Sequence, residues 1–128
     1  CLLSRGLGDV YKRQILMISY SESNINFMNS DKFSMMKNQS YFINTSRGEM
    51  VNEHDLLENL KSGKLKGAAL DVLHNDSNWS QNIEGSHNLI KYANDHNNLI
   101  ITPHIGGYGI DSIRNTRIYI IKKLIKFI

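Results

Sequence analysis

Three residues of this sequence have the chemistry of a site that binds an anion and transfers a proton: Arg47, Asp71 and His104. Arg47 follows an apolar stretch in the segment Asn44–Gly48, and arginine offers a planar pair of donors to a carboxylate. His104 follows Pro103, and histidine is the side chain best suited to exchange a proton near neutral pH. Together they indicate chemistry on a small acidic molecule.

Taken singly, these residues leave structural alternatives open. An arginine in a loop is more often a solvated charge, and a histidine beside glycines is more often a hydrogen-bonded loop residue. Asp71 lies in an apolar stretch, where a buried acid needs partners, so a role in bonding backbone amides is as well supported as a functional one. The other histidines lack the spacing of metal ligands, and we expect no metal.

The elements that must position these residues alternate between apolar extended stretches and helical patterns. We predict strands at 15–20, 40–44, 67–72 and 99–102. We also predict a helix that starts near Ser30, a helix that Asn52 caps and a left-handed Gly63 ends, and helices at 87–94 and 109–128. Such alternation indicates an α/β fold with a parallel sheet. Arg47 and His104 both follow predicted strands, at the sheet edge where such folds bind ligands.

Composition excludes several other classes of protein. The chain has 128 residues, and its 15 basic and 12 acidic residues give a net charge of +3. Residues 1–14 have no initiator methionine and resemble translated adapter sequence, so we expect a non-native leader there and the protein itself at 15–128. Without that leader the net charge is +1, which does not favour nucleic acid. No apolar run approaches the ~20 residues of a membrane span, so we expect no membrane association.

Three motifs in a fixed order are more specific than any single residue. They read INTSRGEMVNE at 43–53, SGKLKGAALDV at 62–72 and TPHIGG at 102–107. In this order they resemble the D-isomer-specific 2-hydroxyacid dehydrogenases over roughly residues 15 to 126. The resemblance implies the C-terminal part of the NAD-binding domain, which is a partial, doubly wound parallel sheet of the Rossmann type with a closing C-terminal helix.

The resemblance also implies an oxidoreductase that transfers a hydride between NAD(H) and a D-2-hydroxy acid or 2-keto acid. In that family Arg47 would hold the substrate carboxylate and keto oxygen, and His104 would give or take the hydroxyl proton. Asp76 would pair with His104, although the family usually has glutamate there, and Glu84 is the alternative partner. Asp71 would hold the nicotinamide carboxamide.

The nicotinamide end of the cofactor would be lined by the backbone of two short segments. Their residues are Thr45, Ser46 and Arg47 in the first and His104, Ile105, Gly106 and Gly107 in the second. NADP is not excluded, because the residue that selects between the cofactors would lie upstream. The glycine-rich phosphate loop of the family is missing from this sequence, so we expect the chain to be inactive alone.

The implied partners are a small acid substrate and a second subunit in a homodimer of the whole protein. We expect a cytoplasmic, bacterial enzyme, and the single cysteine agrees with a reducing compartment. The alternative is a non-catalytic, NAD-binding regulator of the corepressor type, which has the same fold and retains the same residues.

Overall fold

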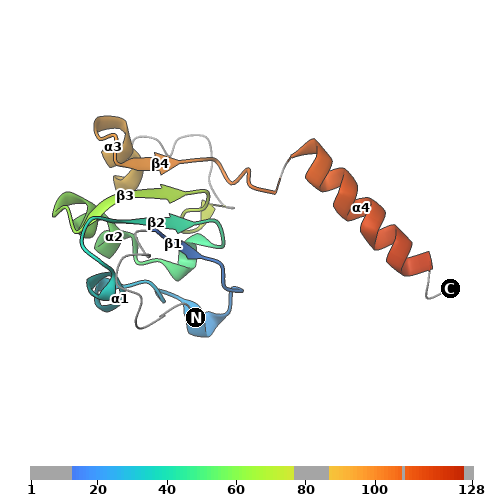
Figure 1. Cartoon of the computed structure of the whole chain (residues 1–128), viewed down its shortest axis with the longest axis horizontal. Helices are drawn as coiled ribbons and strands as arrows, with labels where there is room; N and C mark the ends of the chain where they lie inside the picture. Colours follow the sequence, from blue (N-terminus) through green and yellow to red (C-terminus); the bar gives the residue numbers. More distant parts are fainter. Residues whose placement is uncertain (1–12, 77–86, 108, 126–128) are drawn as a thin grey trace.

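The computed structural model describes residues 13–76, 87–107 and 109–125, and Figure 1 shows the arrangement of their elements. Along the chain these are β1 (Arg13–Leu16), the 3₁₀ turn η1 (Glu22–Asn24), α1 (Ser30–Met35), β2 (Ser40–Asn44), the 3₁₀ turn η2 (Gly48–Met50), α2 (Glu53–Lys61), β3 (Leu65–Leu70), α3 (Asn88–Asp95), β4 (Leu99–Ile101) and α4 (Ile110–Ile125). The predicted alternation of strands and helices is confirmed. None of the described helices combines the length and apolarity needed to cross a membrane.

The four strands form one sheet in the order β1-β2-β3-β4, and every pair is parallel. The order advances in one direction, and right-handed crossovers therefore place α1, α2 and α3 on the same face of the sheet. The predicted parallel sheet of the Rossmann type is confirmed. A sheet of this type has helices on both faces, and α1, α2 and α3 form the helical layer on one of them.

The two faces of the sheet differ in burial, because neighbouring residues of a strand point to opposite sides. Phe42, Ala68 and Leu99 are adjacent in register, and all three are buried in the core beneath the helices. On the other face Ile15 and Ile100 are 50% and 62% exposed. The described part of the chain therefore leaves this second apolar face partly open to solvent.

Local signals fix the helices between the strands. Asn52 caps α2 as predicted, since its side chain accepts a hydrogen bond from the backbone N–H of Asp55 at 3.1 Å. Gly63 ends that helix with φ 73°, a left-handed conformation that glycine adopts without strain. α1 begins at Ser30 as predicted, and its cap is Asn29, whose side chain accepts a hydrogen bond from the N–H of Lys32 at 3.2 Å.

Strand boundaries differ from the predictions by a few residues. β1 begins at Arg13, two residues before the predicted strand and within the segment expected to be a leader. β3 covers 65–70, so Asp71 lies directly after the strand and not inside it. Its N–H still donates to the carbonyl of Asn44 at 2.9 Å, which extends the pairing with β2 by one bond.

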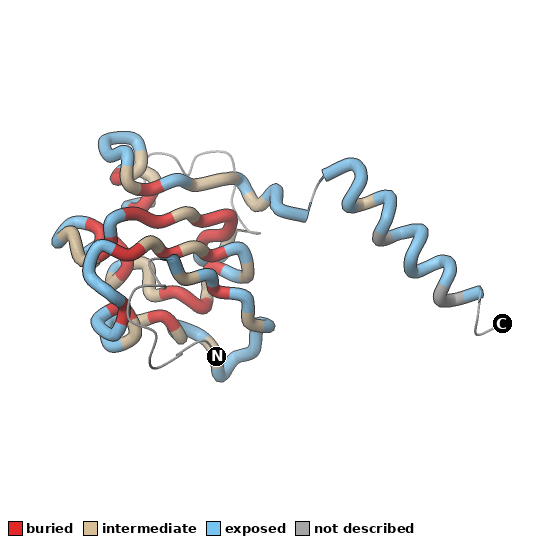
Figure 2. The backbone as a smooth tube through the Cα atoms, viewed as in Figure 1, coloured by how far each residue is buried: buried red, intermediate tan, exposed pale blue. Residues whose placement is uncertain are grey.

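The C-terminal helix α4 forms as predicted, but it extends away from the sheet (Figure 1). None of its described side chains belongs to the buried core, and Ile120, Ile121 and Ile125 are exposed (Figure 2). These three isoleucines are therefore not covered by the described part of this chain.

Candidate active site

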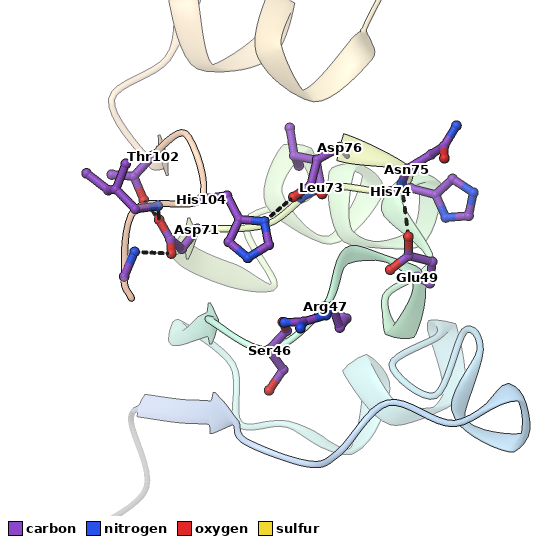
Figure 3. Close-up of polar contacts among 12 residues, drawn as sticks. Ser46, Arg47, Glu49, Asp71, Leu73, His74, Asn75, Asp76, Thr102 and His104 are labelled. Carbon is purple, nitrogen blue, oxygen red and sulfur yellow. Dashed lines mark hydrogen bonds and ion pairs between the residues drawn. The ribbon is translucent and has the colours of Figure 1, made fainter. Parts of the chain in front are cut away.

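Three segments meet at the carboxyl edge of the sheet, where β2, β3 and β4 end. They are residues 44–48, 71–76 and 102–107, and Figure 3 shows polar side chains from all three. In a parallel sheet all strands end at the same edge, so segments far apart in sequence become neighbours. Each segment carries one or more of the predicted site residues.

The segment after β2 is organised by Asn44, whose side chain is fully buried. Its amide donates to the carbonyl of Arg47 at 3.0 Å and its oxygen accepts from the N–H of Ser46 at 3.0 Å. Ser46 in turn donates through its hydroxyl to the carbonyl of Leu16 in β1 at 2.9 Å. Asn44 is thus a structural determinant of this segment that the sequence motif contained but we did not single out.

Arg47 is exposed on this ordered turn, and one of its guanidinium nitrogens donates to the carbonyl of Ser46 at 2.7 Å. None of the ion pairs found in the described parts of the chain includes Arg47. The turn thus holds the base of the side chain and one guanidinium nitrogen, and the remaining N–H groups of this exposed side chain are available to an anion.

Asp71 is the organising acid of the segment after β4. One carboxylate oxygen accepts from the Thr102 hydroxyl at 2.5 Å and from the N–H of Ile105 at 2.9 Å, and the other accepts from the N–H of Gly106 at 2.7 Å. A Cβ on Gly106 would lie only 2.7 Å from the same oxygen, so glycine permits this approach. Asp71 therefore has the structural role that the sequence left open, in which an acid at a strand end bonds backbone amides.

The pKa of Asp71 is lowered from its ordinary value. Burial opposes ionisation, but the hydrogen bonds from Thr102, Gly106 and Ile105 and the nearby His104 outweigh it. Asp71 is thus a carboxylate at neutral pH, and its charge is used to hold the turn that carries His104.

His104 sits in that turn with φ 54°, an uncommon conformation for a residue with a side chain. Its Nδ1 lies 3.0 Å from Oδ2 of Asp76, whose side chain is 20% exposed. Because a carboxylate only accepts, Nδ1 is the donor, and Nε2 is left to face the side of the site where Arg47 lies (Figure 3). A histidine oriented by an acid is the usual form of a proton-transfer group.

The structure thus brings Arg47, Asp71, Asp76 and His104 to one edge, where the sequence pattern had placed Arg47 and His104. Asp71 was expected inside a strand, and Asp76 followed from the family resemblance. Their catalytic and cofactor-binding roles, and those of Thr45, Ser46, Ile105, Gly106 and Gly107, stay predictions. The amides of Ile105 and Gly106 are directed to Asp71. Glu84, the alternative partner of His104, lies outside the described residues. Within the described residues, no group of three or more His, Cys, Asp or Glu could hold a metal ion.

The sequence profile of one family matches residues 14–106, and its description is D-isomer specific 2-hydroxyacid dehydrogenase, NAD binding domain. This chain belongs to that family. The match covers all three segments of the site up to Gly106, and it confirms the resemblance on which the sequence interpretation depended.

Individual relatives agree with this assignment. The chain is 32% identical over 98 residues to a D-lactate dehydrogenase of Lactiplantibacillus plantarum. The aligned region covers 73% of this chain and 30% of the relative. The NAD-complexed D-isomer specific 2-hydroxyacid dehydrogenase of Lactobacillus delbrueckii ssp. bulgaricus superposes with a TM-score of 0.76 at 29% identity, over 88% of this chain and 36% of the other. A relative from Xanthobacter autotrophicus Py2, in complex with NADPH and MES, gives a TM-score of 0.60 at 26% identity, over 73% and 35% of the two chains. The chain thus spans about a third of the length of these relatives.

Proposed function

We propose that this chain is part of the NAD-binding domain of an oxidoreductase that interconverts D-2-hydroxy acids and 2-keto acids. The observation that carries the proposal is the hydrogen bond between Nδ1 of His104 and Asp76, at 3.0 Å on the edge that also presents Arg47. At one edge of the sheet, this geometry supplies both a proton-transfer group and a cation that can bind a carboxylate. The family assignment supports the same reaction.

The residues of this chain would divide the work as follows. Arg47 binds the carboxylate of the acid through two parallel hydrogen bonds. In keto-acid reduction protonated His104 gives its Nε2 proton to the oxygen that develops negative charge, while Asp76 keeps the ring oriented and stabilises the cation. Oxidation of the hydroxy acid reverses the proton transfer. The bound nicotinamide would supply or accept the hydride.

The described residues fit a nicotinamide at this edge. A Cβ added at Gly107 would meet no atom within 4 Å, so the backbone there is open to a flat ring. The three donors on Asp71 leave about one of the roughly four acceptor positions of a carboxylate, which is enough for one N–H of a carboxamide. We propose that Asp71 holds the carboxamide, and that the backbone of Thr45, Ser46 and Arg47 and of the residues from His104 to Gly107 lines the ring.

We propose NAD as the cofactor, with NADP as the alternative. The NAD-complexed relative supports the former, and the relative in complex with NADPH supports the latter. The open sheet face around Ile15 and Ile100, together with the exposed isoleucines of α4, supports further protein cover, from the rest of a longer chain and from a second subunit of a homodimer. The low cysteine content supports the cytoplasm as its location.

Steady-state kinetics of the longer protein that contains this chain would test the proposal. We expect reduction of small 2-keto acids with NADH or NADPH, and a loss of turnover on the order of 100-fold or more in His104→Gln with cofactor affinity retained. Control measurements with 3-keto acids should show no turnover. Tight binding of NADH without turnover of any 2-keto acid would overturn the enzyme and favour the regulator of the corepressor type.

A further inference from the structure

Two segments of the site are in direct backbone contact. Gly48 follows Arg47 and lies against the peptide that joins Leu73 to His74, so a Cβ on Gly48 would be 2.0 Å from the carbonyl carbon of Leu73. The distance leaves no room for any side chain. The turn that carries Arg47 therefore packs on the turn that leads to Asp76.

Two glutamates that follow Arg47 in the chain bind consecutive backbone amides of the turn that leads to Asp76. Oε1 of Glu53 accepts from the N–H of His74 at 2.8 Å, and Oε1 of Glu49 accepts from the N–H of Asn75 at 3.2 Å (Figure 3 shows the second bond). Asn75 has φ 58°, in the left-handed region, so the chain turns sharply just before Asp76. The two glutamates thus hold the residues that set the direction of Asp76.

Glu53 has a second contact that fixes it in place. Its Oε2 lies 3.1 Å from Nε2 of His87, and both side chains are about four-fifths buried. A hydrogen-bonded carboxylate with little solvent around it is held more rigidly than one on the surface. Glu53 therefore joins three parts of the molecule: the first turn of α2, the backbone at His74 and the residue just before α3.

We propose that Glu53, assisted by Glu49, is a positioning residue that sets the orientation of Asp76 and, through it, of the His104 ring. The inference rests on the proposed function, in which the Asp76–His104 pair transfers the proton. Neither glutamate lies within hydrogen-bonding contact of His104 in the structure, so both act through the backbone of His74 and Asn75.

Glu53 also lies in the first turn of α2, where any acid stabilises the helix. A purely structural role would therefore lower stability in a Glu53 variant without changing His104. Asp55 offers a matched control, because it lies in the same helical turn but accepts from the N–H of Ser30, away from the site. Comparing Glu53→Ala with Asp55→Ala separates a general effect on α2 from a specific effect on the site.

The experiment is ¹⁵N NMR of the five histidine rings in the whole chain, with hydrogen exchange of the His74 amide. In the wild type we expect neutral His104 to carry its proton on Nδ1, because the Asp76 carboxylate accepts there. In Glu53→Ala the Nδ1–H tautomer should lose its majority, and the His74 amide should exchange about 10-fold faster or more. Glu53→Gln retains an acceptor oxygen and should restore most of both signals.

Asp55→Ala should leave the His104 tautomer as in the wild type. Should Glu53→Ala fail to fold, Glu49→Ala provides the same test through Asn75, with a smaller expected change. If His104 carries its proton on Nδ1 in the wild type and its signals are unchanged in Glu53→Ala, the positioning role is overturned and the proposed function stays intact. A wild type with the proton on Nε2 would overturn the Asp76–His104 pair itself, and with it both proposals.

Discussion

The turn after β4 and the helix α4 are separated by only a few residues, yet they are determined in different ways. Residues 102–106 are held by Asp71, which lies more than 30 positions earlier, through three hydrogen bonds to its carboxylate. α4 begins with a hydrogen bond between residues four positions apart, from the N–H of Ile113 to the carbonyl of Gly109 at 3.0 Å. Its described side chains lie outside the core. A local pattern is sufficient for a helix, whereas the candidate site depends on contacts between distant segments. Substitutions at the sheet edge should therefore have large effects, and those in α4 small ones.

The largest effect is expected from Arg47→Lys, measured as kcat/KM for keto-acid reduction by the longer protein that contains this chain. An ammonium group cannot reproduce the two parallel hydrogen bonds of a guanidinium, and the loss should be about 2–4 kcal/mol of transition-state stabilisation, or roughly 30- to 1000-fold. Cofactor affinity should be nearly unchanged. Near-normal activity of the lysine variant would remove Arg47 from the substrate site.

Gly48→Ala should be the next most severe change, measured as the free energy of unfolding in urea. The new methyl group would meet the backbone at Leu73, which cannot rotate away, so we expect a loss of about 2–3 kcal/mol. Gly107→Ala is the control, because its Cβ meets no atom within 4 Å and should change stability by less than about 0.5 kcal/mol. Equal stability of the two variants would contradict the close contact between the Arg47 and Asp76 turns.

Asp71→Asn should cost about 1.5 kcal/mol at neutral pH, since an amide cannot accept all three hydrogen bonds of the carboxylate. The pKa of Asp71 is lowered in the folded state, so its contribution is fully present above the unfolded value of 3.8 and is lost as pH falls through the folded value. The difference in unfolding free energy between wild type and variant should therefore shrink below pH 3.8. If the unfolding free energies of wild type and Asp71→Asn differ by the same amount at pH 7 and at pH 3, the charge of Asp71 does not stabilise the turn. Glu58→Gln, on the surface of α2, is the control.

The smallest effect is expected in α4. Ile121→Lys should change the unfolding free energy of the sheet and its helices by less than about 0.5 kcal/mol, because Ile121 is exposed and outside the core. Leu56→Ala in α2, at a fully buried position, should cost about 2–5 kcal/mol in the same assay. A cost above 1 kcal/mol for Ile121→Lys would mean that α4 packs on the rest of the chain in solution, and the contrast with the sheet edge would fail.

The sequence predicted the elements well where local rules apply. The strand at 40–44 was predicted residue by residue, and the cap at Asn52 and the left-handed Gly63 were both confirmed. Predictions were less accurate at strand boundaries, which depend on pairing with the neighbouring strand. β3 ends at Leu70, before the predicted end at residue 72, and β1 begins at Arg13, before the predicted start at residue 15.

The sequence by itself determined the parallel α/β class and the residue types of the site, because periodicity, caps and motif order depend on residues close together in the chain. Only the tertiary structure decided which side chains meet. It brought Asp76 into contact with His104, as the family resemblance implied, it turned the carboxylate of Asp71 toward the backbone of Ile105 and Gly106, and it brought Glu53 to the N–H of His74. These contacts join segments 21 to 35 residues apart, and their distances follow from the register of parallel strands and the path of the intervening loops, which no local pattern specifies.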